Sequence, residues 1–118
     1  MNENILRENG VNLDNSLELL GDMDMYNETL DMFIEENQNR IPRLLNYKNS
    51  GDMPNYAIEV HSLKSDCKYL GFMNLAEVAY DHELKSKEGD IDYINNHYNE
   101  LIAEYDKVNE IIRKYKGE

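Results

Sequence analysis

A clear helical pattern occurs in Val60-His61-Ser62-Leu63-Lys64-Ser65-Asp66-Cys67-Lys68-Tyr69-Leu70-Gly71. Counted at about 100° per residue, its apolar side chains continue a stripe that begins at Tyr56 and lies on one face of a helix. The stripe comprises Tyr56, Val60, Leu63, Cys67 and Leu70. The spacing therefore predicts the second half of an amphipathic helix that packs on a core along this face.

His61 falls well off the apolar stripe. It shares its face with Ala57, Ser65 and Lys68, and Lys64 lies beside it. A histidine on the outside of a helix keeps one ring nitrogen free as a nucleophile near neutral pH, and cations within one or two turns can stabilise an added negative charge. The pattern suits an imidazole that accepts and holds a phosphoryl group.

The same residues resemble a known family. The pattern His61-x-Leu63-Lys64-Ser65, followed by Leu70-Gly71, resembles the core motif of the histidine-containing phosphotransfer (HPt) domains of bacterial phosphorelays. That motif reads His-x-Leu-Lys-Gly with a later Leu-Gly or Ile-Gly. One departure is Ser65, and serine is the next smallest residue after the usual glycine. Similar patterns extend the resemblance over residues 10–115: Gly10-Val11-Asn12-Leu13-Asp14, Leu17-x-x-Leu20-Gly21-Asp22, Tyr26…Phe33 and Leu75-Ala76-x-x-Ala79.

The resemblance implies a phosphorelay intermediate. His61 is expected to accept a phosphoryl group from the aspartate of a receiver domain, or from a hybrid sensor histidine kinase, and to pass it to a response regulator. Lys64, within one helical turn, is expected to support the phosphoryl oxygens. HPt domains leave the Mg²⁺ and most of the active site to the receiver. The resemblance therefore implies no cofactor or metal site, and no ATP-dependent kinase activity, in this chain.

The docking surface for the receiver is expected to surround His61. Ala57 and Ile58 lie on the outer side of the same helix, where an exposed isoleucine has no role in a core, and we expect them to contact the receiver. Ser65 is expected to keep the site open and to donate a hydrogen bond, and Lys68 is a weaker candidate for cationic support. An alternative is an inactive HPt-like module that binds a receiver domain without phosphotransfer. The presence of both the histidine and the motif lysine argues against it.

The chain has 118 residues and a formal net charge of −12. This length predicts one domain, residues 1–118, too small for a deep enzyme cleft and a separate cofactor module. The acidic balance argues against nucleic acid or an anionic membrane as the partner. The single cysteine, Cys67, excludes an internal disulfide and is expected to be buried. The start of the chain is polar, with no signal peptide, and no apolar run is long enough to span a bilayer, so a cytoplasmic location is expected.

The remaining pattern predicts an all-α protein, because only two prolines interrupt it and no strand-like alternation stands out. Asp14 and Asp52 are expected to be N-caps, Gly21 to end the first helix, and Pro42 to bend the second. Four helices are predicted before residue 90, over residues 14–20, 23–48, Asp52 to Gly71 and 73–87.

The last predicted helix carries the most regular pattern. After the expected N-cap Asp90, apolar side chains recur at alternating spacings of three and four residues: Ile91, Ile94, Tyr98, Leu101, Tyr105, Val108, Ile112 and Tyr115. This heptad stripe suits an antiparallel four-helix bundle with a short extra N-terminal helix. At about 1.5 Å per residue, a helix of about 26 residues reaches about 39 Å, further than the fourth helix can cover. The surplus is expected to pack on the N-terminal helix or, alternatively, on a second chain.

The other two histidines are assigned structural roles. His82 falls on the inward face of its helix and is expected to be a hydrogen-bonded core residue, whereas His97 lies beside the heptad stripe and is expected at the surface. A di-iron bundle enzyme would need paired Glu-x-x-His motifs, and the residues three before the histidines are Ile58, Ala79 and Ile94. A histidine kinase is excluded by the size of the chain and by the lack of a Gly-rich phosphate loop.

Overall fold

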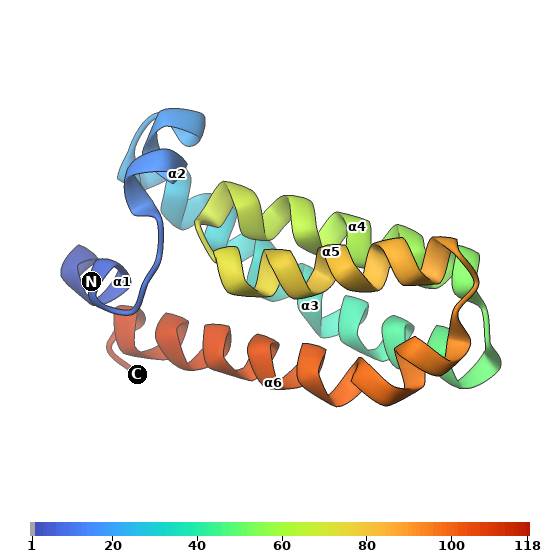
Figure 1. The fold of residues 1–118 in the computed structure, drawn as a ribbon. Coiled ribbons are helices and arrows are strands. Elements are labelled where there is room, and N and C mark those ends of the chain that lie inside the picture. Colours follow the sequence, from blue (N-terminus) through green and yellow to red (C-terminus); the bar gives the residue numbers. More distant parts are fainter. Residues whose placement is uncertain (1) are drawn as a thin grey trace.

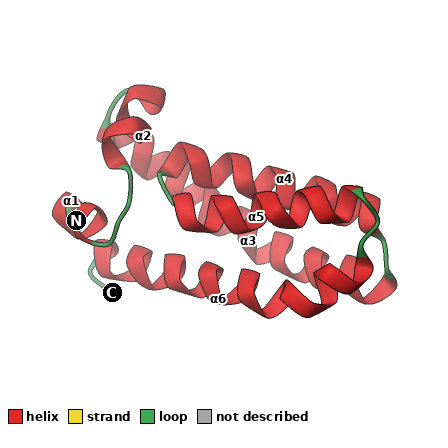
Figure 2. Ribbon diagram, viewed as in Figure 1, coloured by secondary structure: helices red, strands yellow, loops and turns green. Residues whose placement is uncertain are grey.

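Residues 2–118, which the computed structural model describes, form six helices and no strand, so the all-α prediction is confirmed (Figure 1, Figure 2). Met1, the first residue of the expected domain, lies outside the described residues. None of the helices in residues 2–118 combines the length and the apolarity needed to span a bilayer. The helices are α1 (Glu3–Glu8), α2 (Leu13–Leu20), α3 (Met23–Ser50), α4 (Met53–Leu70), α5 (Met73–Lys87) and α6 (Ile91–Lys116).

The four long helices lie lengthwise beside one another in a helical bundle with extents of 41 × 26 × 21 Å (Figure 1). α4 and α5 pack closely along their length, α3 lies against α4, and α6 lies against α5. Aspartate side chains cap the N-termini of three of these helices. Two of the caps, Asp52 and Asp90, were predicted from the sequence. Asp22, Asp52 and Asp90 accept hydrogen bonds from the backbone N–H groups of Met25, Asn55 and Tyr93, at 2.9, 3.3 and 3.0 Å.

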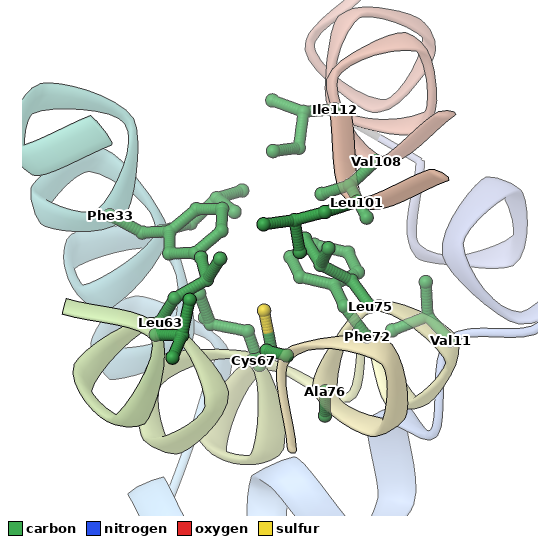
Figure 3. Packing of buried hydrophobic residues seen from close by; sticks show 14 of the residues in the cluster. Val11, Phe33, Leu63, Cys67, Phe72, Leu75, Ala76, Leu101, Val108 and Ile112 are labelled. Carbon is green, nitrogen blue, oxygen red and sulfur yellow. The ribbon is translucent and has the colours of Figure 1, made fainter. Parts of the chain in front are cut away.

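The core lies between the four long helices and includes every residue of the stripe predicted on α4. Tyr56, Val60, Leu63, Cys67 and Leu70 are all fully buried. Figure 3 shows Leu63 and Cys67 facing Phe33 of α3 on one side and Leu75 of α5 and Leu101 of α6 on the other. Burial raises the pKa of the Cys67 thiol well above its ordinary value, which fits the apolar role predicted for it. The buried stripe fixes the rotation of α4 and therefore the direction in which His61 points.

The far end of α6 is covered by a helix that the sequence pattern did not predict. α1 packs against α6, whereas α2, the helix expected to cover this surplus, lies against α3 and α4 (Figure 1). The end of α6 is also tied to α3, because the Tyr115 hydroxyl donates a hydrogen bond to Asn27 Oδ1 at 2.6 Å. The expectation that the surplus packs within the chain holds, but its partner is α1.

The start of α2 corrects a second prediction. The helix begins at Leu13, and Asp14 lies inside its first turn, where the carboxylate accepts a hydrogen bond from Arg7 at 2.6 Å and does not cap the helix. The loop before α2 is held by the main chain, because the Asn12 N–H donates to the Gly71 carbonyl oxygen at 3.0 Å. Contact with the turn between α4 and α5, and not a side-chain cap, therefore sets where α2 begins.

Gly71→Ala should lower the free energy of unfolding by about 1–3 kcal/mol. Gly71 has a φ of +83°, and a Cβ there would lie 2.8 Å from the Asn12 carbonyl oxygen, so the substitution adds a clash to an unfavourable backbone conformation. Urea unfolding measures the loss. Gly89→Ala is the matched control, because Gly89 has a φ of +76° and no atom within 4 Å of its Cβ position. Equal losses in the two variants would show that the contact with Asn12 contributes nothing.

A buried arginine joins α3 to α4. Arg40 is 2% exposed, and its Nη2 donates to Asp66 Oδ2 at 2.8 Å and to Ser62 Oγ at 3.2 Å. Its Nη1 donates to Asn37 Oδ1 at 2.9 Å. A charged group is buried here because its guanidinium finds a carboxylate on the neighbouring helix. The apolar neighbour of Arg40 in the sequence, Ile41, is only partly buried.

Asp66→Asn is expected to destabilise the bundle by about 2–3 kcal/mol in urea unfolding, because it leaves the buried Arg40 charge without a counterion. The cost stays below that of a fully buried pair because the Asp66 side chain is 39% exposed and water can partly replace it. Asp31→Asn, which breaks the more exposed ion pair with Lys116, should cost less than about 1 kcal/mol. A similar loss in both variants would refute the assigned role of Asp66.

Candidate functional site

His61 lies in the middle of α4 and points away from the core, as its place off the apolar stripe predicts. Its side chain is 58% exposed, whereas Val60 beside it and Leu63 are fully buried. The imidazole is therefore accessible to another molecule while its backbone is held by a packed helix.

A carboxylate from α5 fixes the orientation of the ring. His61 Nδ1 lies 2.8 Å from Oε2 of Glu83, whose side chain is only 3% exposed. An ionised carboxylate can only accept hydrogen bonds, so Nδ1 carries the proton in this contact. In the neutral ring the lone pair then lies on Nε2, the nitrogen remote from Glu83, which is left as the nucleophilic atom.

Two lysines bind the same carboxylate. Lys64 Nζ donates to Glu83 Oε1 at 2.6 Å, and Lys87 Nζ donates to Oε2 at 2.8 Å. Burial alone would raise the pKa of Glu83, but the hydrogen bonds from Lys64, Lys87 and His61 outweigh it and lower that pKa to about 2. Glu83 is thus ionised throughout the physiological pH range. Two ammonium groups and one carboxylate leave a net positive charge beside the imidazole, which suits an anionic group on the ring.

A hollow of about 500 Å³ opens beside His61 between α4 and α5. Ile58 lines it and is 65% exposed, in agreement with the prediction of an outward isoleucine. Ala57 also lines it, but it is only 5% exposed, so it forms part of the floor and not of the outer face where it was expected. The rest of the wall comes from Pro54, His61, Glu83, Ser86 and Lys87.

Ser65 and Lys68 lie toward the C-terminal end of α4. Ser65 is partly buried, and Lys68 is exposed and lines a second hollow of about 300 Å³ together with Tyr80 of α5. The structure brings Lys64, and not Lys68, to the carboxylate that holds His61. Lys87 is the second cation there, and neither it nor Glu83 was picked out from the sequence.

The other histidines lie apart from this site. His82 is fully buried, and the Tyr56 hydroxyl lies 2.8 Å from its Nδ1, which confirms the hydrogen-bonded core histidine that was predicted. Burial lowers the pKa of His82 to about 4. His97 stacks on Tyr93 and lies 3.2 Å from Glu100, with its side chain 42% exposed. Residues 2–118 contain no group of three or more His, Cys, Asp or Glu side chains placed to hold a metal ion.

A known domain family matches the larger part of this chain. The sequence model of the Hpt domain matches residues 28–110, which run from α3 into α6 and contain His61, Lys64, Glu83 and Lys87. Neither a curated protein nor a solved structure matches the chain. The match covers well over half of the sequence, so the chain belongs to the Hpt domain family, whose members are phosphotransfer intermediates that act with the receivers and kinases of two-component signalling.

Proposed function

We propose that this chain is a phosphorelay intermediate that accepts a phosphoryl group on Nε2 of His61. The donor is an aspartyl phosphate of a receiver domain, including that of a hybrid sensor kinase, and the acceptor is a response regulator. The observation that carries the proposal is the 2.8 Å contact between His61 Nδ1 and the buried Glu83 carboxylate, because it leaves Nε2 as the free nitrogen of an exposed ring.

In the proposed step the lone pair of Nε2 attacks the phosphorus of the acyl phosphate. A nitrogen–phosphorus bond forms, the bond from phosphorus to the aspartate oxygen breaks, and the aspartate leaves as a carboxylate. The ring keeps its proton on Nδ1, and Glu83 stabilises the positive charge that the ring gains. The reverse reaction with a second receiver passes the group on, so no external oxidant or base is needed. Phosphoryl transfer depends mainly on positioning and on charge stabilisation, and a rigid helix and nearby lysines supply both.

Each side chain around His61 has an assigned part. Lys64 supports the phosphoryl oxygens, because it shares Glu83 with the imidazole and retains further N–H donors. Ser65 leaves room above the helix for a partner. Ile58, with Ala57 beneath it, and Lys68 belong to the surface on which the receiver docks. The exposure of Ile58 supports this assignment, because a large apolar side chain next to a hollow gains by being covered.

The remaining proposals concern the chain as a whole. We infer that α3, α4, α5 and α6 form an antiparallel four-helix bundle and that residues 1–118 act as a single domain. It works in the cytoplasm, where it meets receivers and a hybrid sensor histidine kinase and not nucleic acid or a membrane. It needs no cofactor and has no ATP-dependent kinase activity of its own. The match to the Hpt domain family supports these proposals.

The test is phosphoryl labelling of the wild-type protein by a panel of phosphorylated receivers. We expect a label that is lost in acid and stable in base, as a phosphohistidine is, with tandem mass spectrometry placing it on His61. A label on an aspartate or serine, or a label stable in acid, would overturn the proposal. Receiver binding without any label would instead identify an inactive docking module.

A further inference from the structure

Lys64 is held by a second residue of α5 besides Glu83. Its Nζ lies 5.0 Å from the centroid of the Tyr80 ring, and Tyr80 precedes Glu83 by one helical turn. The Lys64 side chain is only 12% exposed, although it belongs to the outward part of α4. The ammonium group therefore lies between a carboxylate and an aromatic face, both from α5.

These two contacts act differently on the ammonium charge. Glu83 neutralises it in part, and the same carboxylate also accepts hydrogen bonds from His61 and Lys87. An aromatic face attracts a cation within about 6 Å, but it carries no net charge and does not bind phosphoryl oxygens. A lysine side chain has four rotatable bonds, and fixing them costs conformational entropy each time it must be placed. Contact with the Tyr80 ring restricts the Lys64 side chain before any substrate binds, so part of this entropy cost is already offset in the free protein.

We propose that Tyr80 is a positioning residue for phosphotransfer, which holds the Lys64 ammonium group beside His61 without neutralising it. The inference rests on the proposed role of His61 and adds a residue to it. Tyr80 acts through Lys64 and touches no reacting atom. Because the ring is 46% exposed and lines the second hollow, direct contact with a receiver is the competing explanation, and the test is designed to separate the two.

The experiment measures the rate at which phosphoramidate, a small donor without a protein surface, labels His61. Tyr80→Leu is expected to slow labelling about two- to fivefold, the range that a cation–π contact contributes at a partly exposed site. Tyr80→Phe keeps the aromatic face and should label at the wild-type rate. In the Lys64→Ala background, which is itself expected to be slow, Tyr80→Leu should cause no further loss.

Matched controls make the result specific. Tyr69→Leu removes a tyrosine of similar exposure, 48%, from α4 and should leave the rate unchanged. Circular dichroism checks that each variant is folded. NMR reports the contact without any reaction: the ε-methylene protons of Lys64 should show an upfield ring-current shift in the wild type and in Tyr80→Phe, and lose it in Tyr80→Leu.

Several outcomes would overturn the role of Tyr80. A wild-type rate for Tyr80→Leu, an equal loss for Tyr80→Phe, or a loss that persists in the Lys64→Ala background would each exclude action through Lys64. Lack of the ring-current shift would exclude the contact itself. Failure of the proposed function would give a different result. The wild-type protein would then carry no label at His61 from phosphoramidate or from any receiver.

Discussion

His61→Gln is expected to reduce phosphoryl labelling from any donor to background while the bundle stays folded. An amide nitrogen has no available lone pair, so the variant has no nucleophile at this position. The side chain of His61 is 58% exposed and belongs to no part of the core, and Glu83 keeps Lys64 and Lys87 as partners when the contact with the imidazole is lost. The free energy of unfolding should therefore fall by no more than about 1.5 kcal/mol. Labelling with a charged receiver measures the first effect, and urea unfolding followed by circular dichroism measures the second.

His97→Gln is the control for this result, because His97 is also helical, partly exposed and within 3.2 Å of a glutamate. It should label at the wild-type rate. Persistent labelling of the His61→Gln protein would place the acceptor elsewhere. Loss of the label from both variants would indicate that the assay reports the fold and not the nucleophile.

Glu83→Ala should slow phosphoryl transfer to His61 about 10- to 100-fold, the size of effect that follows when a group that orients a functional histidine is removed. Without the carboxylate, the proton is free to occupy Nε2, which removes the nucleophilic lone pair from that nitrogen in part of the molecules. Lys64 and Lys87 lose their shared partner as well. Single-turnover transfer from a phosphorylated receiver measures the rate, and the ¹H–¹⁵N spectrum of the imidazole measures the tautomer.

Glu83→Gln separates orientation from charge. Its amide oxygen can still accept from Nδ1, so the tautomer should be largely kept and the rate should fall less than in Glu83→Ala. Glu100→Ala removes the partner of His97 and should not affect transfer. If the Glu83→Ala protein kept both the wild-type rate and the wild-type tautomer, Glu83 would have no positioning role.

The parts of the molecule that follow from local periodicity could be predicted from the sequence. The stripe of α4, the aspartate caps of α4 and α6 and the outward place of His61 depend only on neighbours within a few turns. Lys64 of the candidate site could be predicted for the same reason, since it lies one helical turn from His61. These features need no knowledge of which helix packs on which.

Glu83 and Lys87 could not be found in this way. Glu83 lies on another helix, and its place beside His61 depends on how α5 is rotated and shifted against α4, which the spacing within either helix does not determine. The one local signal was the separation of Glu83 and Lys87 by four residues, which is common on helix surfaces. α1 was missed because Glu3–Glu8 is too short to show a period, and the burial of Arg40 depends on Asp66 across the helix interface.

The side chains that line the hollow beside His61 all come from one helical hairpin, α4 and α5 with the turn between them, residues 53–87. Its inner face contributes to the shared core, and its outer face carries the candidate site. The hairpin is thus a unit whose surface residues can be exchanged as a set between related proteins. With the proposed docking face, exchanging the outward residues of the hairpin for those of another family member is expected to alter partner preference without redesign of α3 or α6. The contact between Gly71 and Asn12, which holds the turn of the hairpin, would have to be retained.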